Sequence, residues 1–189
     1  MSGDPNQPEL LVHTIRKVGA VTAALQQLRE GEFVGVRGPF GNPWPLSEAK
    51  RKDIVILAGG LGLAPLRPVI YHILEHQRDY KKITLCYGAR NPEAILFSDE
   101  LEQWTHRIEV ALTVDSAGPG WSGHVGVITD RLQQQAIALT NTIAFVCGPE
   151  IMMRYSAYAL IDNGLSADRI YISMERNMKC AVGLCGRCQ

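Results

Sequence analysis

Three cysteines near the end of the chain have the spacing of a metal site. Cys180, Cys185 and Cys188 form the pattern C-x4-C-x2-C, and Gly183 and Gly186 lie between them. Three of the four thiolates that hold a plant-type [2Fe–2S] cluster have this spacing, and glycines allow a loop to wrap closely around two iron atoms. The tail therefore predicts a one-electron transfer centre.

Two other interpretations of these thiols stay open. They can be unligated on an exposed tail, or they can form half of a zinc site, which usually has two C-x2-C pairs. The plant-type pattern requires a fourth Cys further along, whereas the sequence ends at Gln189. We therefore expect a fragment that lacks the fourth cluster ligand.

A glycine-rich segment indicates a second kind of chemistry. Gly59, Gly60 and Gly62 follow an apolar run at 54–58, and Pro65 lies in the first turn of the helical pattern that comes next. Glycines at such a corner let backbone N–H groups approach a phosphate, and a helix N-terminus favours an anion. The segment lacks the G-x-G-x-x-G fingerprint and can be only a tight connection. Its place after a strand nevertheless favours dinucleotide binding of a different lineage.

A second corner of the same type lies further along the chain. Cys147 ends the apolar run 142–147, and Gly148 and Pro149 precede a helical pattern. In open parallel sheets, ligands bind at the carboxyl ends of neighbouring strands where the strand order switches, so we expect both corners to face one cleft. A buried Cys can also be a small apolar core residue, and both roles stay open for Cys147.

The elements that must position these corners alternate along the chain. Nearly continuous apolar strands separated by amphipathic helices are typical of a parallel sheet covered on both faces. The sequence therefore predicts an α/β fold with a doubly wound five-stranded parallel sheet. The apolar runs are 54–58, 83–87, 108–114, 142–147 and 169–173, and the helical patterns are 64–78, 92–105, 127–139 and 150–163.

The first part of the chain has a different pattern. Strand-like pieces at 11–16 and 33–37 flank a helix-like piece at 21–28, and the Gly- and Pro-rich segment 38–45 is typical of a linker. A domain boundary near residue 50 follows. We expect three parts, which are residues 1–46, a nucleotide-binding domain at 50–174 and the cysteine segment at 175–189.

Composition narrows the class of partner. The 189 residues include 19 basic and 19 acidic side chains, a balance that gives no sign of a nucleic-acid surface or a polybasic membrane anchor. No apolar run reaches the ~18 residues of a membrane span, and the polar first residues do not resemble a signal peptide. Cys86 and Cys147 lie in apolar runs, unlike the cysteines of a disulfide framework. We expect a cytoplasmic protein that binds small molecules or nucleotides.

Three separated segments carry a family resemblance. They are the first corner at 59–66, the run Tyr87-Gly-Ala-Arg90 with Leu96 and Phe97, and the second corner at 147–153. Together they resemble the ferredoxin–NADP reductase superfamily. The tail resembles that of the gamma subunit of cytoplasmic NiFe hydrogenases and that of the corresponding electron-transfer subunit of anaerobic sulfite reductase. The electron-transfer subunit of dihydroorotate dehydrogenase is a more distant relative with the same plan.

This resemblance implies a set of cofactors and roles. A small antiparallel β-barrel, of which residues 1–46 would be a part, binds FAD in that family, and the nucleotide domain brings NAD(P)H to the flavin. A [2Fe–2S] cluster then accepts single electrons for a partner catalytic subunit. The resemblance implies that the diphosphate of the dinucleotide is bound by Gly59, Gly60, Gly62 and Pro65. It places Cys147, as the catalytic residue, beside the nicotinamide with Gly148 and Pro149. The implied cluster ligands are Cys180, Cys185 and Cys188.

The flavin side and the coenzyme choice are less sharply defined. Gly19 and Thr22 resemble the segment that meets the FAD diphosphate, and an ordinary helix N-cap is the alternative. Arg90 suits the 2′-phosphate of NADPH, whereas Glu93 and Asp99 would repel it, so the coenzyme is predicted only as NAD(P). The family's barrel begins before this sequence, and its Arg-x-x-Ser segment is absent. FAD and the cluster therefore belong to the parent function and can be absent from a fragment.

The main prediction is an electron-transfer subunit of the hydrogenase or sulfite reductase type. Its alternatives are the dihydroorotate dehydrogenase electron-transfer subunit and a non-catalytic nucleotide-domain scaffold with a zinc-binding tail. A third possibility is a complete flavin reductase that serves a soluble acceptor. Colourless protein with stoichiometric zinc would favour the scaffold, and dye reduction by NAD(P)H without added flavin would favour the reductase.

Overall fold

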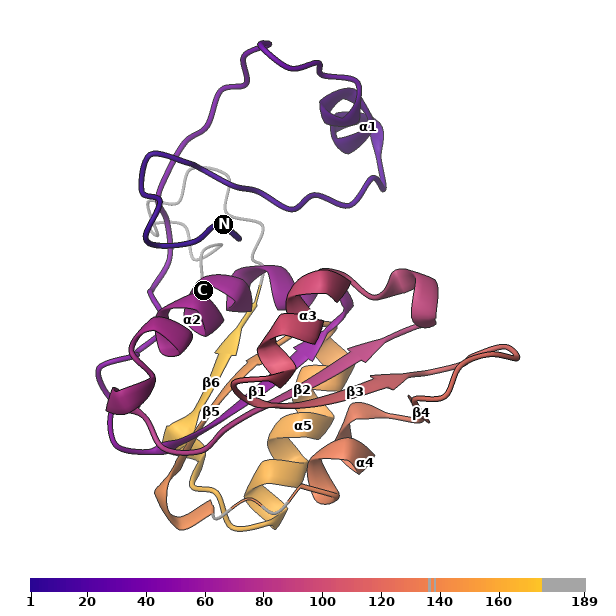
Figure 1. The fold of residues 1–189 in the computed structure, drawn as a ribbon. Helices are drawn as coiled ribbons and strands as arrows, with labels where there is room; N and C mark the ends of the chain where they lie inside the picture. The colour runs from indigo at the N-terminus through magenta and orange to yellow at the C-terminus, as the bar shows by residue number, and fades with distance from the viewer. Residues whose placement is uncertain (136, 138, 175–189) are drawn as a thin grey trace, which may run out of the picture.

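The computed structural model of the chain describes residues 1–135, 137 and 139–174. Helices and strands alternate around one sheet, in which all neighbouring strands are parallel and the order is β4-β3-β2-β1-β5-β6 (Figure 1). The strands are β1 (Asp53–Gly59), β2 (Ile83–Ala89), β3 (Glu109–Val114), β4 (His124–Val125), β5 (Thr142–Cys147) and β6 (Ile170–Ser173), and the helices are α1 (Ala20–Gln26), α2 (Leu63–Glu75), α3 (Ser98–Thr105), α4 (Ile128–Gln133) and α5 (Glu150–Asp162).

The two faces of the sheet carry separate cores because side chains alternate along each strand. Ile54 and Ile56 of β1 face α2 and α3, whereas Val55 and Leu57 face α4 and α5. Figure 1 shows these helix pairs on opposite sides of the sheet. A central strand that is covered on both faces must be apolar throughout, which explains the unbroken run in β1.

The predicted doubly wound parallel sheet is confirmed. Each of the five apolar runs forms a strand, and the order places β1 between β2 and β5. The prediction of five strands is wrong by one, because β4 pairs with β3 through only two residues, at Thr113↔His124 and Val114↔Val125. An element of this length has no periodicity that the sequence could reveal.

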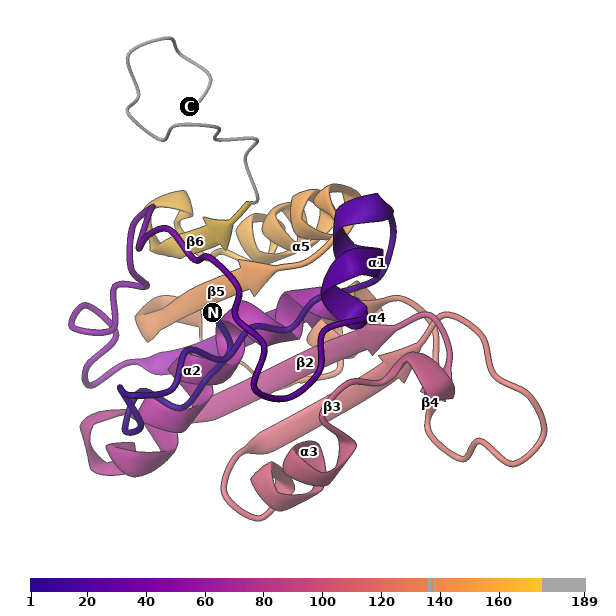
Figure 2. The same ribbon diagram turned by 90° about the horizontal axis from the view of Figure 1, so that it is seen from above.

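The strands predicted at 11–16 and 33–37 do not form. The helix predicted between them does, as α1, and the rest of residues 1–46 has no strand pairing. A strand needs a neighbour for its N–H and C=O groups, and the apolar side chains of Leu11 and Phe33 are 64% and 98% exposed. Figure 2 shows this segment running across the face that α2 and α3 cover. Its assignment to a flavin-binding barrel stays a prediction.

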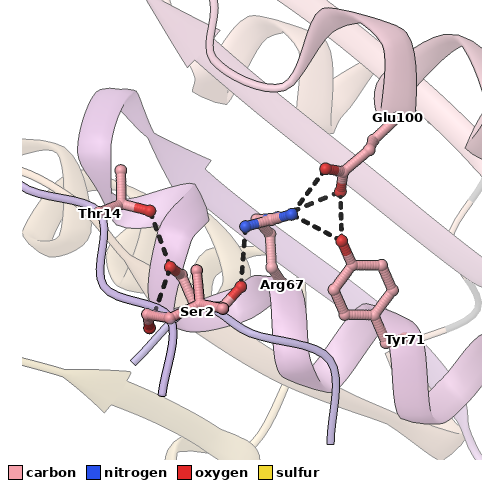
Figure 3. Close-up of polar contacts among 6 residues, drawn as sticks. Ser2, Thr14, Arg67, Tyr71 and Glu100 are labelled. Carbon is pink, nitrogen blue, oxygen red and sulfur yellow. Dashed lines mark hydrogen bonds and ion pairs between the residues drawn. The ribbon is translucent and has the colours of Figure 1, made fainter. Parts of the chain in front are cut away.

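Arg67 of α2 ties the beginning of the chain to the sheet domain. Its guanidinium donates to the Ser2 carbonyl oxygen at 2.8 Å and to both carboxylate oxygens of Glu100 in α3, at 2.6 and 3.1 Å. The Tyr71 hydroxyl accepts from Arg67 and donates to Glu100, each at 2.7 Å (Figure 3). Ser2 is buried, and its hydroxyl lies 2.7 Å from that of Thr14. This network joins three segments that are distant in sequence.

The segment predicted to be a linker has no regular structure but is anchored at its end. The Trp44 ring packs edge-on against Phe145 of β5, with ring centroids 5.3 Å apart. Its indole N–H donates to the carbonyl oxygen of Pro65 at 3.2 Å. Trp44 therefore fixes the chain against the first turn of α2. Among the described residues, no helix has the length and apolar character to cross a bilayer.

Candidate functional site

The two predicted corners touch each other at the carboxyl edge of the sheet. β1 and β5 are neighbours, with Ala58 paired to Cys147, so the turns that follow them leave the sheet side by side. A β-carbon on Gly62 would overlap the carbonyl oxygen of Cys147 and lie 2.7 Å from the Cα of Gly148. Glycine is therefore required at position 62 by close backbone packing. This contact shows that the two corners are adjacent, and their common ligand cleft stays a prediction.

Met152 of α5 fills the space beside the corner. A β-carbon on Gly59 would overlap the Met152 sulfur and lie 2.9 Å from Cδ of Pro149. A β-carbon on Gly148 would lie 2.8 Å from the same sulfur and 3.0 Å from the Gly59 backbone. Gly59, Gly62 and Gly148 thus allow two strand–helix connections to pack at backbone distance. Met152 is partly buried against the α5-side core, as expected for helix packing.

Gly60 has a different role, because its α-carbon faces outward. Its φ of +51° is in the left-handed region, and a β-carbon there would have only the Arg16 guanidinium nearby, at 3.6 Å. Among the described residues that guanidinium makes no hydrogen bond or ion pair. The short 3₁₀ turn Gly60–Gly62 leads into α2, at whose N-terminus no described side chain forms a cap. An open glycine and a cation at the start of a helix together suit a phosphate.

The end of β2 forms the neighbouring wall. The buried hydroxyl of Tyr87 donates to the Gly60 carbonyl oxygen at 3.2 Å and accepts from the Leu96 N–H at 3.1 Å. Burial raises the pKa of Tyr87, and the Leu96 N–H and the Arg16 charge oppose this rise. Arg90 follows the strand with an exposed side chain, and its carbonyl oxygen accepts from the N–H of Ser116 at 3.1 Å. Arg90 therefore lies at the rim of the same edge.

Cys147 lies at the base of the corner. Its side chain is 8% exposed and belongs to the core on the α2 side of the sheet. Gly148 is partly buried and Pro149, the N-cap residue of α5, is exposed. Pro65 lies in the first turn of α2, where its carbonyl oxygen is taken by Trp44. Exposure at this corner thus increases from Cys147 to Pro149.

The predicted flavin-side residues open α1. The Thr22 hydroxyl accepts from the N–H groups of Val18 and Gly19, at 2.9 and 3.0 Å, and lies 3.1 Å from the Gly19 carbonyl oxygen, to which it donates. These contacts favour the helix-cap alternative for Thr22. A hollow of about 160 Å³ lies beside it, lined by Ile15, Lys17, Thr22, Leu25 and Gln26. The flavin role of Gly19 and Thr22 stays a prediction.

Comparison with known proteins identifies the family. Residues 56–157, more than half of the chain, match the family described as Oxidoreductase NAD-binding domain. The chain belongs to this family. The match begins in β1 and ends in α5, so it contains both corners.

Two relatives and one solved structure support the assignment. The chain is 37% identical over 188 residues to the Sulfhydrogenase 2 subunit gamma of Pyrococcus furiosus, a match that covers 92% of this chain and 65% of the relative. It is 34% identical over 174 residues to the Probable dihydroorotate dehydrogenase B (NAD(+)), electron transfer subunit of the same organism, covering 92% and 62%. The structure of an NADH-dependent reduced ferredoxin-NADP oxidoreductase matches at 26% identity with a TM-score of 0.71, covering 92% of this chain and 58% of the other.

These matches confirm the resemblance to the ferredoxin–NADP reductase superfamily and its fold. The chain spans less than two thirds of the length of the two relatives. Hydrogenase gamma subunits and dihydroorotate dehydrogenase electron-transfer subunits are both similar to it, as the tail and the corners predicted.

The predicted cluster ligands Cys180, Cys185 and Cys188 lie outside the described residues. Within the described ranges, no three His, Cys, Asp or Glu side chains gather as a metal site would require. A shallow hollow of about 320 Å³ opens at the amino-terminal edge of β2 and β3, lined by residues that include Lys81, Lys82 and Arg107. It lies at the opposite edge from the corners, where open α/β sheets do not bind their ligands.

Sequence reasoning missed two residues of the site. Arg16 lies three positions before Gly19, in a segment predicted to be a strand, and nothing local indicates that it approaches Gly60. Tyr87 was recognised only as part of the run that ends in Arg90. A hydroxyl at an inward strand position next to a glycine corner is the signal that could have drawn attention to it, since a buried hydroxyl needs partners.

Proposed function

We propose that this chain is the coenzyme-binding part of an electron-transfer subunit. NAD(P)H would deliver two electrons as hydride to FAD, and single electrons would pass through a [2Fe–2S] cluster to a partner catalytic subunit of the hydrogenase or sulfite reductase type. The relatives named as a sulfhydrogenase gamma subunit and as an electron transfer subunit support this proposal. The second of them keeps the dihydroorotate dehydrogenase type as the alternative.

The observation that carries the proposal is the backbone contact between the two corners beneath the outward face of Gly60. In this arrangement, a dinucleotide would lay its diphosphate on Gly60, and the Arg16 guanidinium would pair with the phosphate charge. The Cys147–Pro149 backbone would support the nicotinamide on the other side of the same edge. The rim position of Arg90 suits the adenosine end.

Few side chains would take part in the chemistry. The bound flavin and nicotinamide supply the hydride transfer, and no general acid or base is required. The protein would bind and orient the coenzyme through Gly60, Arg16 and Arg90, and Cys147 would present a small, nearly buried side chain beside the reacting ring. Gly19 and Thr22, beside the hollow at α1, would meet the FAD diphosphate, and Cys180, Cys185 and Cys188 would hold the cluster.

Coenzyme binding gives the first test. Titration of the purified chain with NADH and NADPH in a calorimeter should give saturable binding to one of them with a micromolar dissociation constant. Replacing Arg16 with Gln should weaken that binding about tenfold, because one charge-assisted contact to phosphate is lost. Lys17→Gln is the matched control, since it removes one neighbouring positive charge. Absence of binding to both coenzymes would refute the proposal.

Metal content gives the second test. After anaerobic reconstitution with iron and sulfide, a longer version of the protein that supplies the fourth thiolate should show visible absorption and an EPR signal on reduction by dithionite. Cys185→Ser should abolish both signals, whereas Cys86→Ser, at a buried position, should leave them unchanged. A colourless protein that retains stoichiometric zinc would instead support the scaffold alternative.

A further inference from the structure

Tyr87 occupies an unusual place for a polar side chain. It lies in β2 between Ala58 of β1 and Leu112 of β3, and its residue exposure is 0%. Its ring belongs to the core on the α2 side of the sheet. A buried hydroxyl at such a site must be satisfied by hydrogen bonds, and Tyr87 has two of them.

These two hydrogen bonds reach two different segments, one that follows β1 and one that follows β2 itself. The hydroxyl donates to the carbonyl oxygen of Gly60, which also accepts from the N–H of Leu63. It accepts from the N–H of Leu96, which lies between the 3₁₀ turn Pro92–Ala94 and α3. The Tyr87 hydroxyl therefore links the first corner directly to the loop that follows β2.

Both linked segments contain a residue with a positive φ. Gly60 has a φ of +51°, and Phe97, the residue after Leu96, has a φ of +57° although it is not glycine. The Phe97 ring is covered by the Arg67 guanidinium, whose carbon lies 4.0 Å from the ring centroid. A non-glycine residue in the left-handed region persists only where its surroundings fix it. Tyr87 supplies part of that fixation from inside the sheet.

We propose that Tyr87 is a positioning residue for the adenosine diphosphate half of the pyridine dinucleotide. Its hydroxyl sets the separation between the Gly60 turn, on which the diphosphate would lie, and the 95–97 loop, beside which the adenosine would lie. The inference rests on the proposed function. It adds a residue that acts through backbone and does not itself touch the coenzyme.

The test compares ligands that contain different halves of the coenzyme. Tyr87→Phe keeps the ring and removes both hydrogen bonds. It should weaken binding of ADP-ribose, and of whichever of NADH and NADPH the chain binds, about tenfold, which corresponds to about 1.4 kcal/mol. Binding of reduced nicotinamide mononucleotide, which lacks the adenosine half, should change less than twofold. Tyr171→Phe is the matched control, because it removes a hydrogen bond to Glu48 from the edge strand β6, three strands away from β2. It should change the binding of neither ligand.

A second measurement keeps the test valid if Tyr87→Phe folds poorly. In the wild-type chain, ADP-ribose should slow hydrogen exchange in peptides that contain Leu96, and FAD alone should not. NADH and FAD both contain adenosine diphosphate. The measurement with FAD therefore shows whether the protection at Leu96 comes from the pyridine-dinucleotide site or from the flavin site.

The outcomes distinguish the inference from the function beneath it. If the wild-type chain binds none of NADH, NADPH and ADP-ribose, the proposed function is refuted. If the wild type binds ADP-ribose and one of the two coenzymes, and Tyr87→Phe binds them equally well, the role of Tyr87 is refuted. Equal weakening of ADP-ribose and of reduced nicotinamide mononucleotide would also refute it, because a general loss of structure acts on all ligands alike.

Discussion

The dipeptide Phe-Val occurs in two regions of the molecule with opposite results. Phe145 and Val146, in β5, are completely buried, whereas Phe33 and Val34 are 98% and 55% exposed. Both pairs are apolar and suited to strands. β5 has strands on both sides and helices over both faces, while the segment around Phe33 pairs with no other strand in the described chain.

The difference shows where the folding free energy of the described chain is concentrated. Residues 53–174 bury two apolar cores, one on each face of the sheet. Residues 1–46 are held at particular points, by the Ser2 contacts at one end and by Trp44 at the other. The two regions should therefore respond very differently to the same substitution.

The largest difference in stability between the two regions is expected when a phenylalanine in each is replaced by alanine. Phe145→Ala should destabilise the chain by about 3–5 kcal/mol, because it leaves a cavity between β5, Trp44 and Tyr171. Phe33→Ala should change stability by less than about 0.5 kcal/mol, since its side chain is already in water. Urea unfolding followed by fluorescence and circular dichroism measures both. A large loss for Phe33→Ala would mean that residues 1–46 pack against something in solution.

A smaller effect is expected where the two regions are joined. Arg67→Ala should cost about 2 kcal/mol, because it removes a mostly buried guanidinium from Glu100, Tyr71 and the Ser2 carbonyl oxygen. Arg154→Ala, which breaks an exposed ion pair with Glu150, should cost less than about 0.5 kcal/mol.

For Arg67→Ala and its control Arg154→Ala, limited proteolysis distinguishes detachment of residues 1–46 from a general loss of stability. Arg67→Ala should speed cleavage within residues 1–46 at a temperature where the sheet domain remains folded. Unchanged cleavage would show that Ser2 is not held through Arg67.

The smallest effect is a dependence on alkaline pH at the same junction. Burial, followed by the hydrogen bond to Glu100, raises the pKa of Tyr71 to about 12. The folded state therefore keeps this proton longer than the unfolded state, whose tyrosine pKa is about 10. Stability from this group is complete below pH 10 and is lost as the pH rises toward 12. The difference in unfolding free energy between the wild type and Tyr71→Phe should shrink over this interval, and a constant difference would contradict the assignment.

Much of the sheet domain could be predicted from sequence because its signals are local. The central strands β1, β2 and β5 are buried on both faces and are apolar along most of their length, which made their runs easy to recognise. The glycine corners were recognisable because only small residues allow such turns, and their adjacency follows from the rule for parallel sheets.

What the sequence did not reveal depends on distant contacts. The strand propensity at 11–16 and 33–37 is real, but a strand forms only with a partner in space. Tyr87 obtains its role from Gly60 and Leu96, which are brought to it by the sheet and by the turn before α3. The approach of Arg16 to Gly60 likewise depends on how residues 1–46 cross the domain.

The close packing of Gly62 against Cys147 and Gly148 has a consequence for how this site can diverge. A side chain at position 62 would displace the peptide after β5, and that displacement would need a compensating change in a segment encoded far away. Single substitutions at Gly62, Cys147 or Gly148 are thus expected to be lost by selection, while exposed positions such as Arg90 can vary one at a time. Coenzyme preference should accordingly diverge through the exposed positions, whereas the packed residues beneath them should change only together.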